Sequence, residues 1–335
     1  MPLREQLGVW IKDRWRYERA LRSPDRRYLS LANRREQVEA APAGIGYACC
    51  WEFTSKLHAP TVQARLGLRL LQRCLTDAPI ERRLEPVFRG EAPEVSVLIG
   101  HRGTERLPLL LATLETIAAQ QQVAFECLVI EQDDHSCLEG LLPPWVKHVQ
   151  FPLSEGKTGY NRSQAFNDGA RLARGRVLLL HDNDMLVPKQ YLARILEKVK
   201  LGYQVVNPKR YVFYLSRLHS TEVMAGQASI DAEPALAIVQ NLEGGGSMAI
   251  TRDGYWEIGG MDESFQGWGG EDNEFWDRCQ ELRCWRWGYE PIVHLWHPSQ
   301  PLKQARDNVN VSMAHAKIKE DRQARITNLK TKIHH

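Results

Sequence analysis

Two adjacent carboxylates follow a glycine turn with a large aromatic side chain in segment 267–272, which reads Gly-Trp-Gly-Gly-Glu-Asp. The ring of Trp268 offers an apolar surface on which the C–H face of a sugar can stack. Glu271 and Asp272 can accept hydrogen bonds from sugar hydroxyls. Acidic residues are also typical of the first turn of a helix, where they face free N–H groups. The segment therefore predicts a sugar site, with a plain helix start as the alternative.

Two further polar clusters have residue types suited to chemistry. Residues 181–184 read His-Asp-Asn-Asp directly after an apolar run, and His294 and His297 follow farther along the chain. Alternate side chains of an extended segment share a side, so we expect Asp182 and Asp184 to face the same way. Taken singly, an acidic turn after a strand is common, and a histidine in an apolar segment is more often packed than a ligand. All three clusters together, in this order, indicate a metal-dependent glycosyltransferase.

The composition is that of an ordinary globular protein. The chain has 335 residues, 43% of them hydrophobic and 25% charged, and its net charge of +3 is too small to indicate nucleic acid binding. No apolar run has the length of a membrane span, and the first residues lack a signal-peptide core. Seven cysteines without Cys-x-x-Cys spacing disfavour a zinc site or a disulfide framework. We therefore expect a cytoplasmic protein.

Apolar runs and helical patterns alternate from residue 94 onward. The expected strands cover residues 95–99, 127–130 and 176–180, and the expected helices cover residues 107–120 and 163–173. This order is typical of an α/β domain with a mostly parallel, twisted sheet flanked by helices. Ligands bind such sheets beyond the carboxyl ends of the strands. The polar clusters at 100–103, 131–134 and 181–184 all fall at such ends.

The first part of the chain is basic and carries apolar residues at helical spacing. These residues are Leu3, Leu7, Trp10, Ile11 and Trp15. A basic amphipathic helix with tryptophans can lie on an anionic membrane surface. More often, an amphipathic helix packs its apolar face on a protein core. Both interpretations stay open, namely contact with the inner face of a membrane and packing on the catalytic domain.

The chain divides into three parts by composition. Residues 1–90 form an N-terminal helical extension with a further helix at 61–74, and residues 301–335 form a C-terminal helical tail. We expect residues 91–300 to form the catalytic domain, whose composition changes at residue 244, where three glycines allow close backbone approach to a ligand.

With these motifs in place, the chain resembles the β-1,4-galactosyltransferases and their bacterial relatives, which have the GT-A nucleotide-diphospho-sugar transferase fold. The resemblance runs in order from Glu94 to Pro298. It rests on Gly-His-Arg-Gly at 100–103, Glu-Gln at 131–132, Tyr-Asn-Arg-Ser at 160–163, Asp-Asn-Asp at 182–184, Gly-Gly at 245–246, segment 267–272 and His-x-x-His at 294–297. His294 stands where the animal enzymes carry methionine, and Asn273 where they carry an acid.

The resemblance implies a nucleotide-sugar half at residues 91–243 and an acceptor and catalytic half at residues 244–300. It also implies roles for individual residues. The donor nucleotide sugar would contact His101, Arg102, Gln132, Tyr160, Arg162, Asp182, Gly245 and Gly246. Asp184, His294 and His297 would bind a divalent cation. For such oxygen and imidazole ligands Mn²⁺ is favoured, with Mg²⁺ or Co²⁺ as alternatives. Trp268, Gly270 and Glu271 would bind the acceptor sugar, and Asp272 would be the general base.

The implied activity is inverting transfer of a sugar, with galactose or N-acetylgalactosamine favoured, from a UDP-sugar to a hydroxyl of a glycan or lipid-linked glycan. Bacterial surface polysaccharide or glycolipid synthesis fits this acceptor and a cytoplasmic enzyme at the membrane. A glycoside hydrolase is an alternative because it also needs paired carboxylates, although it needs no metal. A non-catalytic sugar-binding relative is another, which the presence of Asp184, Asp272 and His297 disfavours.

Overall fold

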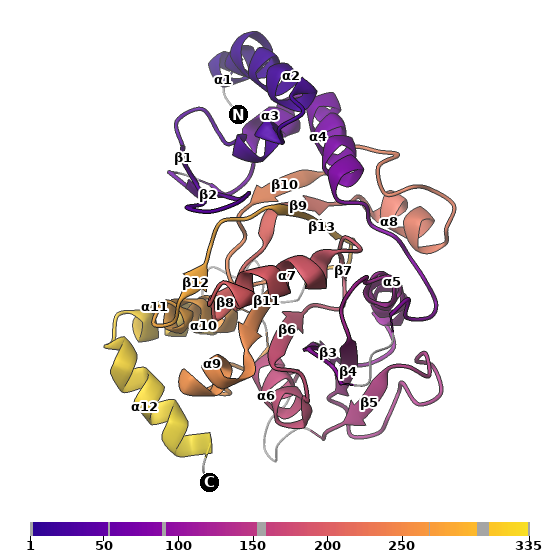
Figure 1. The fold of residues 1–335 in the computed structure, drawn as a ribbon, viewed down its shortest axis with the longest axis vertical. Helices are drawn as coiled ribbons and strands as arrows, with labels where there is room; N and C mark the ends of the chain where they lie inside the picture. The colour runs from indigo at the N-terminus through magenta and orange to yellow at the C-terminus, as the bar shows by residue number, and fades with distance from the viewer. Residues whose placement is uncertain are drawn as a thin grey trace.

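The computed structural model describes residues 3–52, 54–88, 92–152, 159–267, 269–299 and 308–333. Of the predicted site residues, Trp268 lies outside these ranges. Strands of the described chain form a seven-stranded sheet, a four-stranded sheet and a two-stranded sheet. Figure 1 shows the N-terminal helices at one end of the long axis of the molecule and the C-terminal helices toward the other.

The seven-stranded sheet is the centre of the predicted catalytic domain. Its strands lie in the order β12 (Cys284–Trp285), β8 (Val205–Val206), β11 (Ser247–Thr251), β6 (Val177–His181), β3 (Val95–His101), β4 (Phe125–Glu131) and β5 (Lys147–Gln150). Neighbours from β6 to β5 are parallel, whereas β11 is antiparallel to both β6 and β8. The predicted mostly parallel sheet is thus confirmed, and the three expected strands are β3, β4 and β6.

Helices cover both faces of this sheet, as its sequence pattern predicts. Val97 in β3 packs in a cluster with α5 (Leu107–Ala118) and α7 (Tyr191–Lys200). The next residue, Leu98, packs in another cluster with α6 (Arg162–Leu172). Two further helices, α9 (Arg252–Glu257) and α10 (Glu271–Cys279), contribute to this second cluster. Because successive residues of β3 are buried on opposite faces, the strand reads as a continuous apolar run.

The four-stranded sheet brings distant parts of the chain together. Its order is β10 (Ala237–Gln240), β9 (Lys209–Tyr214), β13 (Glu290–His294) and β7 (Met185–Leu186). β13 is parallel to β9 and antiparallel to β7, and α8 (Arg217–Met224) follows β9. The pairing of β7 with β13 places His294 opposite Met185, next to the acidic turn that ends at Asp184.

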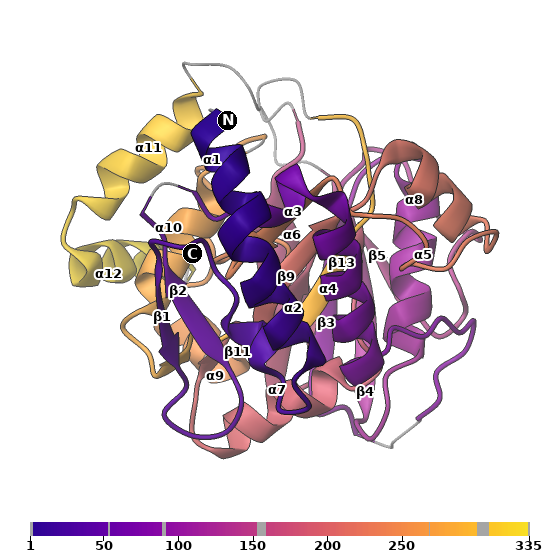
Figure 2. The ribbon, with the colours of Figure 1, turned by 90° about the horizontal axis from the view of Figure 1, so that it is seen from above.

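The N-terminal part of the chain covers this second sheet. It contains α1 (Leu3–Gly8), a π-helical turn η1 (Val9–Asp13), α2 (Arg14–Arg22), a 3₁₀ turn η2 (Arg27–Ser30), the antiparallel pair β1 (Gln37–Ala40) and β2 (Tyr47–Cys50), α3 (His58–Val62) and α4 (Ala64–Asp77). The β1–β2 pair was not expected in a helical extension. Figure 2, seen from above, shows α2 and α4 side by side in front of β9 and β13.

Apolar and polar contacts attach this extension to the catalytic domain. Tyr17 and Leu21 pack in one core cluster with Phe213 of β9. The buried Arg210 side chain donates to the backbone oxygens of Leu29 at 2.5 Å and Leu31 at 2.7 Å. The extension therefore packs on the predicted catalytic domain, which was the more common of the two expected outcomes.

The side of the N-terminal helix that packs differs from the expected one. Four of the five predicted apolar positions have described side chains, and these are exposed: Leu7, Trp10, Ile11 and Trp15. Their spacing is helical, but the π-helical turn and α2 direct Val9, Tyr17, Ala20 and Leu21 to the core instead. No helix that the structure describes is both long and apolar enough to span a membrane.

The C-terminal helices support α10. α11 (Val309–Ile318) and α12 (Arg322–Ile333) lie against it. Arg325 of α12 pairs with Glu274 of α10 at 2.6 Å, and Arg322 pairs with Asp277 at 2.9 Å. The described part of the predicted helical tail is therefore helical and braces the helix that begins at Glu271.

Candidate active site

Asp184, His294 and His297 come together as the sequence predicts. One ligand atom from each lies within 4.8 Å of the others. Asp184 Oδ2 is 3.2 Å from His297 Nε2, and Asp184 Oδ1 is 3.9 Å from His294 Nε2. Asp184 is buried, and its Oδ1 atom has no hydrogen-bond partner. A buried carboxylate oxygen without a partner beside two imidazoles fits a divalent cation, because such a cation would supply the missing interaction.

Backbone pairing and ring stacking hold these three side chains. The amide of Leu295 donates to the backbone oxygen of Asp184 at 2.9 Å, which continues the β7–β13 pairing into the site. The His294 ring stacks on Tyr214 with 4.4 Å between centroids.

Burial lowers the pKa of His297 more than the charge of Asp184 raises it. A neutral imidazole retains the lone pair that a metal ligand needs.

Arg106 enters the same cluster, and sequence reasoning missed it. Its guanidinium donates to His297 Nδ1 at 2.9 Å and lies 3.4 Å from Asp184 Oδ2. Arg106 directly precedes α5, four residues after Arg102. A second arginine in the loop after the first strand was the available signal, since that loop was already expected at the binding edge of the sheet.

The acidic turn between β6 and β7 corrects one expectation. Residues 183–184 form a turn rather than an extended segment, and Asp182 and Asp184 have different partners. Asp182 Oδ1 accepts from Arg162 Nη2 at 2.7 Å and from Nε at 3.0 Å. Although burial raises the pKa of Asp182, the charge and hydrogen bonds of Arg162 outweigh it and hold the pKa below its ordinary value. Arg162 thus neutralises one acid of the pair.

The other two carboxylates stand at the start of α10. Arg162 Nη1 is 3.7 Å from Glu271 Oε1, so this arginine links the acidic turn to the helix. Burial, with the charge of Asp272, raises the pKa of Glu271 to about 7. Its Oε2 atom is buried without a hydrogen-bond partner, whereas Asp272 is partly exposed. The helix start and the acidic pair are thus the same feature, because the first turn of α10 presents both acids beside Arg162.

Glycines on two segments let the backbone approach Asp272 closely. A Cβ at Gly244 would lie 2.5 Å from the backbone oxygen of Asp272, and one at Gly245 would lie 2.6 Å from its Oδ2. Gly270, which precedes α10, has φ +87° and would place a Cβ 2.5 Å from the backbone oxygen of Asn310 in α11. Only glycine fits these positions without displacement of a neighbour.

The predicted donor residues of the first two strands support each other. His101 is buried between Gly103 O, 2.8 Å from Nε2, and the Asn183 amide, 2.9 Å from Nδ1. Burial lowers its pKa, so it joins the first loop to the acidic turn as a neutral ring. Gln132 is also buried, and its Oε1 accepts from the amide of Asn161 at 2.8 Å.

The remaining predicted donor residues lie in loops beside this group. Arg102 is exposed and pairs with Asp133 at 3.3 Å. The Tyr160 hydroxyl lies over Gly100, where a Cβ would come within 2.1 Å of it. The backbone oxygen of Gly246 accepts from the Asp182 amide at 2.8 Å, so the paired glycines also adjoin the acidic turn.

A buried lysine is a second residue that sequence reasoning missed. Lys209 in β9 is fully buried, and its amine donates to the backbone oxygen of Ser247. Burial lowers its pKa to about 7, although the charges of Asp182 and Asp272 act in the opposite direction. Nothing in the sequence near Lys209 sets it apart from an ordinary strand residue. Its contact with Ser247 depends on how the four-stranded and seven-stranded sheets lie against each other.

Comparisons with known proteins show which families the chain resembles. Residues 104–258 match the glycosyl transferase family 2 model, and residues 239–285 match the model for the N-terminal domain of galactosyltransferase. The chain is 27% identical over 239 residues to N-acetylgalactosaminyltransferase 6 of Drosophila melanogaster, which covers 63% of this chain and 34% of that protein. The chain thus spans about a third of the length of that curated relative.

A solved structure is also similar in part. The catalytic domain of Drosophila β1,4-galactosyltransferase 7 in complex with xylobiose has 16% sequence identity and a TM-score of 0.39, covering 68% of this chain and 81% of that chain. The family 2 match over residues 104–258 indicates a glycosyltransferase domain, and the sheet topology is that of a GT-A-like α/β fold. The predicted enzyme class and fold are therefore confirmed.

Proposed function

We propose that this glycosyltransferase moves galactose or N-acetylgalactosamine from a UDP-sugar to a hydroxyl of a glycan acceptor, with inversion at the anomeric carbon and with a divalent cation as cofactor. The observation that supports this best is the convergence of Asp184, His294 and His297, next to an acidic turn whose Asp182 is joined to Glu271 of α10 through Arg162. The resemblance to galactosyltransferases supports the choice of donor sugar. A lipid-linked or polysaccharide acceptor of a bacterial surface is the acceptor class that we favour.

Asp184, His294 and His297 are the residues that would hold the cation, with Mn²⁺ favoured for this set of ligands. When bound, such a cation stabilises the negative charge that develops on the departing nucleotide. Arg106 is adjacent to this triad and donates to His297. Once this hydrogen bond is broken, the Arg106 guanidinium is a candidate to contact the diphosphate of the donor.

The chain's own residues would then act on the acceptor. Asp272 is the proposed general base, because it is partly exposed at the start of α10 and has no arginine bonded to it within the described chain. Glu271 would accept a hydrogen bond from an acceptor hydroxyl through Oε2, the buried atom without a partner. Trp268 would stack on the acceptor sugar, and this role remains a prediction from the sequence. Positioning of the two reactants would supply a large part of the rate enhancement.

Release of UDP from a panel of UDP-sugars tests this proposal. We expect UDP-galactose or UDP-N-acetylgalactosamine to give the fastest release, with dependence on Mn²⁺ and on an added glycan. Product analysis by NMR should show the inverted anomeric configuration. If no UDP-sugar releases UDP but another nucleotide sugar does, the donor assignment is wrong, whereas the assignment to glycosyltransferases stands.

A further inference from the structure

The N-terminal helices leave a row of large apolar side chains in solvent. Leu7 and Trp10 are each 52% exposed, Ile11 is 64% exposed and Trp15 is 74% exposed. The same helices already contribute Tyr17, on another side, to the core. Within the part of the chain that the structure describes, the exposed row is therefore not used in packing. Tryptophan in particular is enriched where proteins meet the interface between water and lipid.

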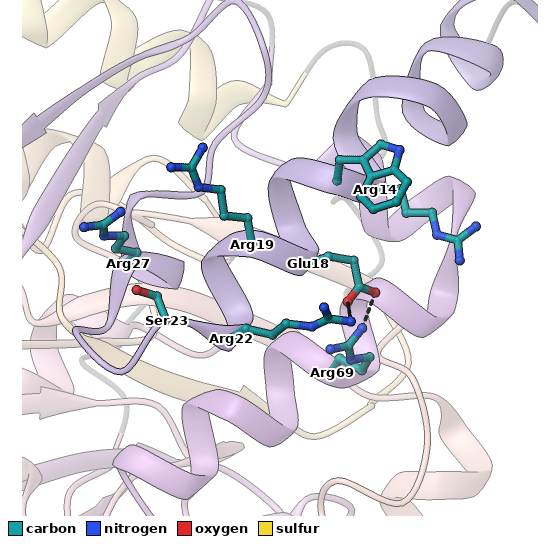
Figure 3. A pocket seen from close by; sticks show the side chains of 8 residues that line it. Arg14, Glu18, Arg19, Arg22, Ser23, Arg27 and Arg69 are labelled. Atoms are coloured by element: carbon teal, nitrogen blue, oxygen red, sulfur yellow. Dashed lines mark hydrogen bonds and ion pairs between the residues drawn. The ribbon is translucent and has the colours of Figure 1, made fainter.

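Arginines line a shallow hollow next to this row. The hollow has a volume of about 610 Å³, and Trp15 is among its lining residues. Figure 3 shows the guanidinium groups of α2, η2 and α4 around it; they belong to Arg14, Arg19, Arg22, Arg27 and Arg69.

The positive charge of the hollow exceeds its negative charge. Glu18 is the acid among its lining residues, and it pairs with Arg69 and, at 3.4 Å, with Arg22. Arg14 and Arg19 form no ion pair with any carboxylate in the described part of the chain. Two exposed cations thus remain available beside the indole ring of Trp15.

The place of these helices in the fold leaves them accessible. Figure 1 shows α1 and α2 at one end of the long axis, and Figure 2 shows them nearest the viewer when that end is seen face on. This end of the molecule can meet a flat surface without obstruction from the other described helices and strands.

We propose that this face, formed by Leu7, Trp10, Ile11 and Trp15 together with Arg14, Arg19 and Arg22, docks on an anionic phospholipid bilayer. The apolar row would enter the interfacial region, and the arginines would contact lipid phosphates. A second copy of the chain is a less suitable occupant than an anionic bilayer, because two copies of the same basic face repel each other. The docking goes beyond the proposed function and does not depend on which sugar is transferred.

Cosedimentation of the full chain with lipid vesicles tests the docking. The probes are vesicles of phosphatidylcholine alone and of phosphatidylcholine mixed with phosphatidylglycerol, each at low and high salt. We expect binding to the anionic vesicles that weakens as salt rises, and little binding to the neutral ones. Point substitutions are preferable to truncation, since removal of α2 would also remove Tyr17 from the core.

Two sets of variants separate the apolar and charged contributions. Arg14→Gln with Arg19→Gln and Arg22→Gln should lower the partition coefficient on the order of 100-fold, because each basic residue near an anionic surface contributes roughly fivefold. Trp10→Ser with Trp15→Ser should weaken binding as well. Leu201→Ser with Leu218→Ser is the matched control, because these leucines are 53% and 65% exposed elsewhere, and this variant should bind like the parent.

The docking is wrong if the parent fails to sediment with anionic vesicles or if the tryptophan variant binds as well as the parent. It is also wrong if the parent dimerises, binds no vesicles and becomes monomeric in the tryptophan variant, since the face would then be a dimer contact. UDP release with a soluble acceptor, measured on the same proteins, should be unchanged. A parent that binds vesicles but releases no UDP would contradict the proposed function alone.

Discussion

The guanidinium of Arg106 donates to His297 Nδ1 at 2.9 Å, while Nε2 of the same ring faces Asp184 Oδ2 at 3.2 Å. With Nδ1 as acceptor, the ring proton is on Nε2 and points to the carboxylate. A cation ligated through Nε2 requires the proton on Nδ1 instead. That proton would then point to the backbone oxygen of Pro298, which lies 2.7 Å away, and Arg106 would lose its acceptor. Arg106 and a divalent cation therefore compete for the same side chains.

Replacement of Arg106 should consequently tighten metal binding. Arg106→Gln removes a positive charge 3.4 Å from Asp184, so we expect the affinity for Mn²⁺ without donor to rise, by roughly tenfold for a partly exposed charge. Calorimetric titration of the free protein with Mn²⁺ measures this. Arg102→Gln is the matched control, because Arg102 pairs with Asp133 instead. Equal Mn²⁺ affinity in the Arg106 variant and the parent would contradict the competition.

Removal of the metal should abolish transfer. Treatment with a chelator is expected to stop UDP release, and added Mn²⁺ to restore it. Asp184→Asn should bind Mn²⁺ far more weakly than the parent, because it removes the anionic ligand of the triad. His135→Gln, which changes an exposed histidine outside the triad, should behave like the parent. Full activity after chelation, with the cation shown to be absent, would exclude the metal site.

Asp272→Asn should separate catalysis from donor binding. Loss of a general base costs on the order of 10²–10⁴ in rate. Because Asp272 is partly exposed and the substitution preserves its shape, UDP affinity should stay close to that of the parent. Single-turnover rates and UDP titration measure the two effects. A large loss of UDP affinity with little loss of rate would place Asp272 in the nucleotide site instead.

The pH dependence of transfer should report Glu271. Its pKa is raised to about 7, first by burial and then by Asp272, so the carboxyl is mostly protonated below that pH and ionised above it. If the ionised form accepts from the acceptor hydroxyl, kcat/KM rises with pH up to about 7 and then levels off. Glu271→Gln cannot ionise, so its lower activity should lack this rise. Retention of the rise at about 7 in the variant would assign it to another group.

Gly270→Ala should destabilise the protein and displace α10. The alanine would have to adopt φ +87° and would also meet the backbone oxygen of Asn310 at 2.5 Å. Strain of this kind costs on the order of 1–3 kcal/mol. Gly226→Ala is the control, since Gly226 has φ +70° with no atom near its Cβ. Thermal unfolding should show a larger decrease in Tm for the Gly270 variant, and equal decreases would mean that the contact with α11 is unimportant.

The sequence predicted the central sheet well because its strands are buried on both faces. Such strands read as uninterrupted apolar runs, and the polar residues after them mark the carboxyl ends. The family resemblance likewise implied that His294 and His297 act with Asp184, and the structure brings the three side chains together.

Other features depend on contacts between distant segments, which local patterns do not encode. The different partners of Asp182 and Asp184 follow from the tight turn into β7 and from the position of Arg162. The exposure of Trp10 and Trp15 follows from which side of the N-terminal helices meets the second sheet. Arg106 was missed for a similar reason, since its partners come from the segment after β13 and from the acidic turn.

The contact between Gly270 and α11 has a consequence for the order in which the site is completed during synthesis. A growing chain whose first 299 residues have left the ribosome holds every partner needed to pair β7 with β13 and to gather Asp184, His294 and His297. The brace for α10 comes later, from residues 309–333. A nascent chain stalled between these points would bring the three side chains together before Glu271 and Asp272 were fixed in place.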